Sequence, residues 1–330
     1  MKTWIQNGHV LDPLTGTDQV CDVLVDGERI KKVGTREEIQ RCLESEDVQM
    51  LDASGCYVMP GFIDLHVHFR DPGLTYKETL KTGGEAAARG GVTTVCAMPN
   101  TKPVIDTKEK VESPVNIIQL GAITVGEEGK ELADIKGMAE AGCMALSEDG
   151  KSVMNSALYR EGMKLAKKYG LLIFAHCEEI DLRRDPDTGE DGVMNKCQRS
   201  EELSLPGITN SVEDIITARD IFLAKDTGVH LHLCHCSTKG TVDLMRMAKA
   251  EGISVSAEVC PHHFTLSTDD ITEDHGRFKM NPPLREMEDV EALRQGLKEG
   301  VMEAISTDHA PHSVEEKDVP MRKAAFGIVG

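Results

Sequence analysis

The chain has 330 residues, 40% hydrophobic and 28% charged, a composition typical of a globular protein with an ample core. Its 56 acidic residues outnumber 37 basic ones, and the resulting net charge of −19 argues against nucleic acid or an anionic membrane as a partner. No run approaches the roughly 18 apolar residues of a membrane helix, and the amino terminus lacks the apolar segment of a signal peptide. We therefore expect a cytoplasmic protein, with its ten cysteines reduced.

Residues 1–55 are expected to form short β-strands. Residues 21–25 and 29–33 flank Asp26-Gly27-Glu28, a composition that favours a hairpin turn. No residues suited to catalysis stand out in this part of the chain.

From residue 57 the pattern changes to eight short apolar runs that alternate with helical patterns. The runs are residues 57–68, 92–98, 115–124, 143–147, 171–176, 229–235, 253–260 and 303–307. The helical patterns are residues 77–89, 131–141, 155–169, 211–225, 241–250 and 289–298, with glycines 170, 228, 252 and 300 at expected C-caps. Near-continuous apolar strands separated by helices favour a parallel sheet buried on both faces, and eight strands predict a (β/α)8 TIM barrel. An open doubly wound sheet is the alternative, but the chain has no GxGxxG or Walker A motif.

Polar residues fall where the apolar runs end, which is the edge at which a barrel places its active site. The polar segment 178–206 interrupts the alternation. It is too long for an ordinary βα loop, and we interpret it either as an excursion over the barrel mouth or as a mobile surface insertion.

The most informative pair is His66 and His68. Residues i and i+2 of a strand point to the same face, so both imidazoles can bind one metal ion, and Arg70 follows on that face. With 12 histidines in the chain, such a pair could arise by chance. The histidines and aspartates that end other runs make a metal site the better interpretation.

Four imidazoles and two carboxylates form the candidate ligand set, which suits one or two zinc ions. The residues are His66, His68, Asp149, His176, His235 and Asp308. Asp149 precedes a glycine and could be a turn residue instead. We interpret His230 and His232 as structural, whereas one of His262 and His263 is a candidate to support the metal site and the other to pack in the core.

An ordered series of motifs resembles the amidohydrolase superfamily and, within it, the class I (bacterial type) dihydroorotases. The motifs are GFIDLHVHFRDPG (61–73), ARGGVTTVCAMPNT (88–101), AHCE (175–178), CHCSTK (234–239), EVCPHH (258–263), KMNPPLR (279–285) and STDHAPH (306–312). The series covers nearly the whole chain.

The resemblance implies that the six candidate ligands bind Zn2+ and that Arg70, Asn100, Asn281 and His312 bind the substrate. It implies a zinc-dependent cyclic amidohydrolase that interconverts N-carbamoyl-L-aspartate and L-dihydroorotate in pyrimidine biosynthesis. The attack is expected from a metal-bound hydroxide, with Asp308 as proton shuttle. A homodimer and an association with aspartate transcarbamoylase are the partner expectations.

The resemblance also predicts the domain layout, with residues 1–55 in a small N-terminal β-sandwich part and residues 56–330 in the metal-dependent barrel. The family fold continues beyond strand 8, where this chain is expected to be truncated. Many superfamily members bridge their metals with a carboxylated lysine, and here Asp149, after Glu148, is expected to take that place. The alternatives are an allantoinase- or dihydropyrimidinase-like enzyme and a non-catalytic partner of the transcarbamoylase.

Overall fold

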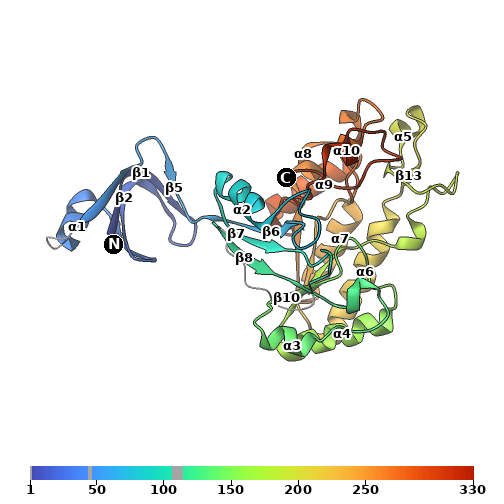
Figure 1. Cartoon of the computed structure of the whole chain (residues 1–330), viewed down its shortest axis with the longest axis horizontal. Helices are drawn as coiled ribbons and strands as arrows, with labels where there is room; N and C mark the ends of the chain where they lie inside the picture. Colours follow the sequence, from blue (N-terminus) through green and yellow to red (C-terminus); the bar gives the residue numbers. More distant parts are fainter. Residues whose placement is uncertain (1, 44–46, 106–113) are drawn as a thin grey trace. The chain divides into compact units, whose positions relative to one another are not determined.

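The computed structural model describes residues 2–43, 47–105 and 114–330. The chain divides into two compact units, Met1–Phe62 and Ile63–Gly330 (Figure 1).

The first unit is a five-stranded sheet in the order β3-β2-β1-β4, with β5 also paired to β1. Its strands are β1 (Lys2–Asp12), β2 (Thr17–Asp26), β3 (Arg29–Gly34), β4 (Val48–Asp52) and β5 (Tyr57–Val58). The β2–β3 pair is antiparallel, which confirms the predicted hairpin. Helix α1 (Arg36–Cys42) was not expected, although Thr35 and Glu38 form a capping box at its start and Ile39 packs on Trp4 and Leu24.

The second unit contains every apolar run after residue 60 as a strand. These strands are β6 (Phe62–Val67), β7 (Val92–Ala97), β8 (Asn116–Gln119), β9 (Gly121–Ala122), β10 (Ala145–Ser147), β11 (Leu172–Ala175), β14 (Leu231–Leu233), β15 (Val255–Val259) and β16 (Ala304–Ile305). They pair in the orders β6-β7-β8 and β9-β10-β11-β14-β15-β16, and only Leu120 separates β8 from β9. A parallel bridge between Val67 and His309 links the end of β6 to the segment after β16.

Helices lie between most of the successive strands, at the places that the sequence predicts, and the chain is an α/β protein (Figure 1). They are α2 (Leu80–Arg89), α3 (Ile135–Glu140), α4 (Ser156–Tyr169), α6 (Ser211–Thr227), α7 (Lys239–Ala250) and α9 (Met287–Glu299). The short helices are α5 (Gln198–Glu202), α8 (Pro261–Thr265) and α10 (Val314–Lys317). Gly170, Gly228 and Gly300 are left-handed C-caps, as expected. Gly252 instead lies one residue beyond the C-cap Glu251.

The polar segment 178–206 is more ordered than its composition suggested. Strands β12 (Met194–Asn195) and β13 (Gly207–Ile208) pair in parallel. Val193, Met194 and Leu205 are buried in one cluster with Met280. Although its composition is too polar to predict a core, the segment contributes to one, because a few apolar residues among many charged ones are enough to anchor it.

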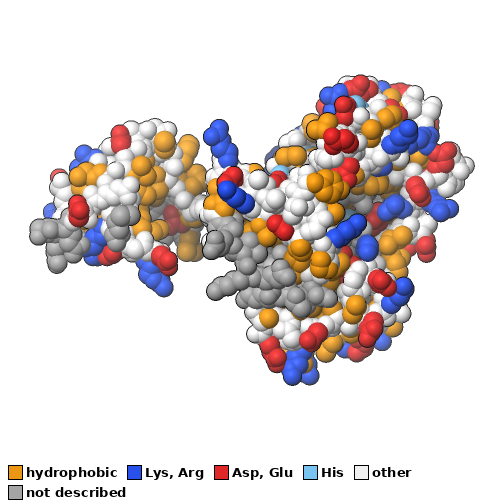
Figure 2. Space-filling model, viewed as in Figure 1, with side chains coloured by type: hydrophobic (Ala, Val, Ile, Leu, Met, Phe, Trp, Pro, Cys, Tyr) orange, Lys and Arg blue, Asp and Glu red, His pale blue; other side chains and the backbone are white. Residues whose placement is uncertain are grey.

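Figure 2 shows acidic and basic side chains interspersed on the visible face of the second unit. Within the described part of the chain, no helix combines the length and apolar character needed to cross a membrane.

Candidate metal centre and its surroundings

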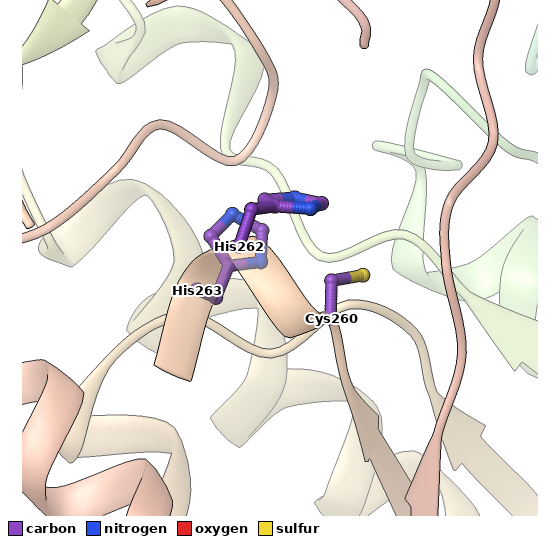
Figure 3. Close-up of side chains that lie close together, drawn as sticks. All are labelled: Cys260, His262 and His263. Atoms are coloured by element: carbon purple, nitrogen blue, oxygen red, sulfur yellow. The ribbon is translucent and has the colours of Figure 1, made fainter. Parts of the chain in front are cut away.

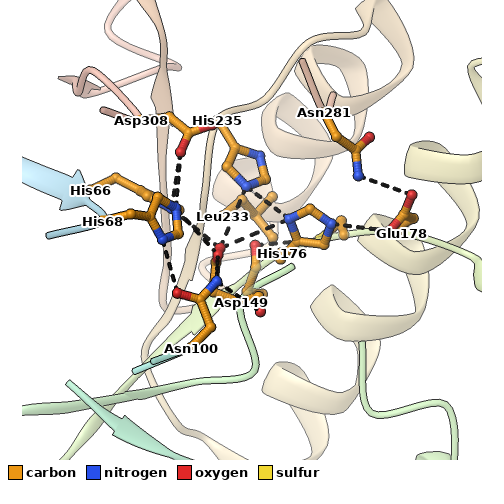
Figure 4. A network of polar contacts seen from close by, with 12 residues as sticks. His66, His68, Asn100, Asp149, His176, Glu178, Leu233, His235, Asn281 and Asp308 are labelled. Carbon is orange, nitrogen blue, oxygen red and sulfur yellow. Dashed lines mark hydrogen bonds and ion pairs between the residues drawn. The ribbon is translucent and has the colours of Figure 1, made fainter. Parts of the chain in front are cut away.

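The structure brings the six predicted ligands together at the carboxyl ends of the parallel strands (Figure 4). His66 lies in β6, and the others follow β6, β10, β11, β14 and β16 within three residues. All six side chains are buried. Residues separated by as many as 242 positions in the chain therefore converge on one small volume.

Asp149 lies at the centre of this group. Its Oδ1 is 3.2 Å from His66 Nε2, 3.8 Å from His235 Nε2 and 3.9 Å from His176 Nδ1. Its Oδ2 is 3.4 Å from His68 Nε2. One carboxylate thus faces four imidazoles, an arrangement suited to bridging two cations.

Asp308 and the neighbouring imidazoles of His176 and His235 complete the arrangement. Asp308 Oδ1 is 3.1 Å from His68 Nε2 and 3.6 Å from His66 Nε2. His176 Nδ1 lies 2.9 Å from His235 Nε2. Two nitrogen ligands of one tetrahedral zinc ion, each bound at 2.0–2.1 Å, are about 3.3 Å apart. The spacings therefore fit donors that share ions.

Two of the central atoms are also unsatisfied. His66 Nε2 and Asp149 Oδ1 are buried and have no hydrogen-bond partner among the described residues. Buried polar atoms are normally paired, so such atoms call for an explanation. A cation between them would satisfy both, and the residues present fit a bound metal.

Three of the four imidazoles have an oxygen acceptor on the ring nitrogen that faces away from Asp149. The pairs are His66 Nδ1 with Glu258 Oε1 (3.1 Å), His68 Nδ1 with Asn100 Oδ1 (2.9 Å) and His176 Nε2 with Glu178 Oε2 (3.3 Å). Such partners fix the tautomer and orientation of metal-binding histidines. The roles of Glu258 and Glu178 were not predicted from the sequence, although both residues lie in its recognised motifs.

The two aspartates are held in their charged form. Burial by itself would raise the pKa of the Asp149 carboxyl, but the charges of His66 and His68 outweigh it and hold this pKa well below its usual range. Burial likewise opposes ionisation of Asp308, whose pKa is nevertheless lowered by a hydrogen bond from His68 and by the charge of His66. Both groups are therefore anionic near neutral pH, which is the form that binds a cation.

Glu148, the neighbour of Asp149, points elsewhere. Its Oε2 accepts a hydrogen bond from the Thr124 backbone N–H at 3.0 Å, and its Oε1 accepts one from the Thr124 hydroxyl. Burial raises the pKa of Glu148 despite these bonds. Asp149, not Glu148, is therefore the carboxylate that faces the imidazoles.

The four predicted substrate residues are distributed around this centre. Arg70 Nε donates to the Pro311 carbonyl at 3.2 Å, and Arg70 Nη2 lies 3.4 Å from His312 Nε2. The structure thus brings Arg70 and His312 together. Asn281 donates to Glu178 Oε1 at 3.0 Å (Figure 4).

Asn100 lies closer to the metal ligands than the prediction implied. Besides its contact with His68, its Nδ2 donates to Asp149 Oδ2 at 3.0 Å. Both ends of its amide are engaged, so in this structure Asn100 orients two proposed ligands. Its contact with substrate stays a prediction.

Backbone strain is concentrated at the same place. Six non-glycine residues in the described ranges have positive φ, and three of them are Arg70 (60°), His235 (35°) and Asp308 (48°). This conformation is costly for side chains with a Cβ and persists where surrounding structure imposes it, often at functional sites.

His262 and His263 lie in the first turn of helix α8, which begins at Pro261 directly after Cys260 (Figure 3). His263 Nε2 donates to the Pro282 carbonyl at 2.9 Å, next to Asn281. Burial lowers the pKa of His262 to about 4, so its ring is neutral at physiological pH. The three side chains place potential ligand atoms within 4.8 Å of one another.

Comparison with known proteins agrees with this geometry. The family model described as "Dihydro-orotase-like" matches residues 55–241. The chain belongs to this family. It is 45% identical to a dihydroorotase of Trichlorobacter lovleyi over 339 residues, spanning all of this chain and 77% of the relative. A Staphylococcus aureus dihydroorotase is 46% identical over 335 residues, with 99% and 76% covered. The family resemblance inferred from the motifs is thereby confirmed.

Solved structures of other cyclic amidohydrolases share the fold of this dihydroorotase-family chain. A D-hydantoinase (dihydropyrimidinase) from Thermus sp. is 25% identical, with a TM-score of 0.75 over 99% of this chain and 74% of its own. An L-hydantoinase from Arthrobacter aurescens is 23% identical, with a TM-score of 0.78 over 99% and 74%.

Proposed function

We propose that this chain is a zinc-dependent dihydroorotase, which reversibly cyclises N-carbamoyl-L-aspartate to L-dihydroorotate in pyrimidine biosynthesis. The observation that carries the proposal is the convergence of four imidazoles and Asp308 on Asp149, in a chain 45% identical to a dihydroorotase over its full length.

The proposal includes a (β/α)8 barrel as the framework of the site. Only Leu120 separates the sheet β6-β7-β8 from the sheet β9-β10-β11-β14-β15-β16, and the Val67–His309 bridge links β6 to the segment after β16; both features support closure. The expected layout, with residues 1–55 in a small β-sandwich and residues 56–330 in the barrel, is kept as a proposal with its boundary moved to residue 62, because β5 (Tyr57–Val58) pairs with β1 in the first unit. A homodimer and an association with aspartate transcarbamoylase are further proposals from the family resemblance.

His66, His68 and Asp308 would hold one zinc ion, His176 and His235 would hold a second, and Asp149 would lie between them. Zinc bound here would polarise the carbonyl under attack and lower the pKa of a water molecule. The short N···O spacings at Asp149, and the lack of hydrogen-bond partners for Asp149 Oδ1 and His66 Nε2 among the described residues, support this assignment.

Asp308 would move the proton. In hydrolysis its carboxylate takes a proton from the attacking water and delivers it to the departing ring nitrogen. Microscopic reversibility requires the reverse in cyclisation: Asp308 takes the proton of the attacking ureido nitrogen and delivers it to the departing oxygen. Because carbamoyl-aspartate carries one more carboxylate than dihydroorotate, cyclisation consumes a proton and gains as the pH falls.

Arg70 would bind the substrate α-carboxylate, with Asn100, Asn281 and His312 around it. A guanidinium matches a carboxylate with two parallel hydrogen bonds. The Pro311 carbonyl and the neighbouring His312 hold Arg70 in place, so its charge is directed before substrate arrives. An uncharged hydantoin or dihydropyrimidine offers no such anion, which favours dihydroorotate over the substrates of the hydantoinase alternative.

A substrate panel tests this assignment. The zinc-loaded protein is assayed with carbamoyl-aspartate, dihydroorotate, hydantoin, dihydrouracil and allantoin. We expect kcat/KM for dihydroorotate to exceed that for each uncharged ring by at least about a hundredfold, because the wrong substrate leaves the half-buried Arg70 cation unpaired. A preference for an uncharged ring would favour the hydantoinase alternative. No turnover of any compound by zinc-loaded protein would favour the non-catalytic one.

A further inference from the structure

A continuous line of polar side chains leads away from His66 along strands β14 and β15. Its successive contacts are Ser254 Oγ–His230 Nδ1 (2.9 Å), His230 Nε2–Ser256 Oγ (2.9 Å), Ser256 Oγ–His232 Nδ1 (2.8 Å), His232 Nε2–Glu258 Oε2 (3.0 Å) and Glu258 Oε1–His66 Nδ1 (3.1 Å). Alternate residues of a strand share a face, which explains the two-residue spacing on both strands. Ser254 is exposed and Glu258 is completely buried, so the line runs from the surface to the candidate metal centre.

Glu258 joins two imidazoles inside the protein. One oxygen faces His66, the other faces His232, and Oε1 also accepts from the His235 backbone N–H at 3.3 Å. A buried carboxylate is tolerated when its oxygens accept hydrogen bonds. Both imidazoles must therefore present an N–H to Glu258.

This requirement fixes the tautomers along the line. If His232 Nε2 carries the proton, its Nδ1 is an acceptor, and the Ser256 hydroxyl must donate to it. Ser256 Oγ can then accept from His230 Nε2–H, and the Ser254 hydroxyl donates to His230 Nδ1. Each group from Ser254 to His232 is then satisfied with its donor pointing toward Glu258, which accepts from His66 at the other end, and such chains strengthen each member.

The consequence reaches the metal centre. With Nδ1–H of His66 donated to Glu258, His66 Nε2 presents its lone pair toward Asp149 and Asp308. The tilted contact between the Phe174 and His232 rings, whose centroids are 4.6 Å apart, limits rotation of His232. The sequence pattern alone had led us to interpret His232 as a structural core residue.

We propose that His232 and Glu258 are positioning residues of the metal centre, which together hold His66 in the tautomer and orientation that bind metal. The inference rests on the proposed metal site. It adds to that site residues of two strands that do not bind metal themselves. Through their hydrogen bonds they orient His66, which does.

Glu258 could alternatively be a ligand itself. His66, Cys234 and Glu258 place a nitrogen, a sulfur and an oxygen within 4.8 Å of one another. The two roles differ in a measurable way, because removing a ligand of a further ion lowers the number of bound metal ions. Removing a positioning residue weakens binding without changing that number at saturation.

The test compares Glu258→Gln, His232→Leu and His232→Gln with the parent protein. Glu258→Gln keeps the shape but loses the charge. His232→Leu removes the donor, whereas His232→Gln keeps an N–H near the position of Nε2. Zinc affinity is measured by competition with a chelator, and zinc at saturation is counted per chain. The tautomer of His66 is read by 15N NMR of the metal-free protein, at a pH high enough for its imidazole to be neutral.

We expect zinc affinity to fall about 10- to 100-fold in Glu258→Gln and His232→Leu, as for other partners of metal-binding histidines, with the zinc count unchanged. His232→Gln should recover most of the affinity, and Ser254→Ala, at the exposed end, should match the parent. His66 should be protonated on Nδ1 in the parent and of mixed tautomer in Glu258→Gln.

Parental affinity and parental His66 tautomer in folded Glu258→Gln would overturn the inference, even if His232→Leu fails to fold. A lower zinc count at saturation would also overturn it by making Glu258 a ligand. A parent protein that binds no zinc would contradict the proposed function instead, and the NMR measurement on metal-free protein would still test the tautomer.

Discussion

Asp149 Oδ1 lies 3.2 Å from His66 Nε2, yet neither atom has a hydrogen-bond partner among the described residues. A proton between them would be expected to form a directed hydrogen bond. A cation bound by both atoms requires only that the lone pairs of Asp149 Oδ1 and His66 Nε2 point to the same place. This relationship is the geometric basis for placing metal at the carboxyl ends of the strands.

Removing the charge of Asp149 should lower the zinc content, whereas removing the charge of its neighbour Glu148 should not. Asp149→Asn should lose one or both zinc ions, because a neutral amide cannot bridge two cations. Glu148→Gln should keep the parental zinc content, because Glu148 bonds to Thr124. Metal analysis of the two purified variants checks this. Equal loss of zinc in both, with both folded, would remove the special role of Asp149.

Arg70→Lys should separate substrate binding from metal binding. Lysine keeps the charge but loses the planar fork, so KM for carbamoyl-aspartate should rise by about tenfold or more while zinc content stays parental. Steady-state kinetics with metal analysis measures both. A parental KM would show that Arg70 does not bind the substrate carboxylate.

Asp308→Asn should retain the fold and most of the zinc but lose cyclisation and hydrolysis together, because one group serves both directions. General acid–base groups contribute roughly 10²- to 10⁴-fold, and a loss of this size is expected in each direction. Rates are measured both ways with zinc in excess. Full recovery by added zinc would make Asp308 a ligand only, and substantial activity in one direction would exclude it as the shared proton carrier.

The strands and the ligands were predictable because their signals are local. Each buried strand is a short apolar run, and each proposed ligand stands within three residues of a strand end. Helix α1 was not predicted, although the spacing of Thr35 and Glu38 is that of the capping box with which the helix begins.

The residues around the ligands were harder to predict. Glu258 contacts His66 across 192 positions, and sequence spacing carries no information about such a pair. A signal was nevertheless present, since Ser254, Ser256 and Glu258 put polar groups at every second position of an otherwise apolar strand. Alternation of this kind within a strand expected to be buried on both faces indicates a polar interior line.

Glu127 provides a test of the electrostatics near the site. Burial, followed by the charges of Asp149 and Glu148, raises the pKa of Glu127 to about 8 from an ordinary value of 4.5. Between these values the unfolded chain loses a proton that the folded protein keeps, so stability should fall as the pH rises through this window. The contribution of one group is at most about 1.4 kcal/mol per pH unit.

Glu127→Gln should therefore flatten the pH dependence of stability and raise stability above pH 8. Denaturant unfolding of chelator-treated parent and variant between pH 5 and pH 9 measures the difference. Parallel profiles for the two proteins would show that Glu127 is ionised normally in the folded state.

The central claim is that Asp149 and its neighbours bind the zinc on which dihydroorotase activity depends. The most direct measurement is a zinc titration of chelator-treated protein, with dihydroorotate formation from carbamoyl-aspartate followed at each addition. We expect no turnover without metal, and a turnover rate that rises with added zinc until the number of zinc ions bound per chain is reached. Asp149→Asn should not reach the parental rate. Turnover by metal-free protein, or zinc binding that saturates without turnover, would show that the bound zinc does not support the reaction.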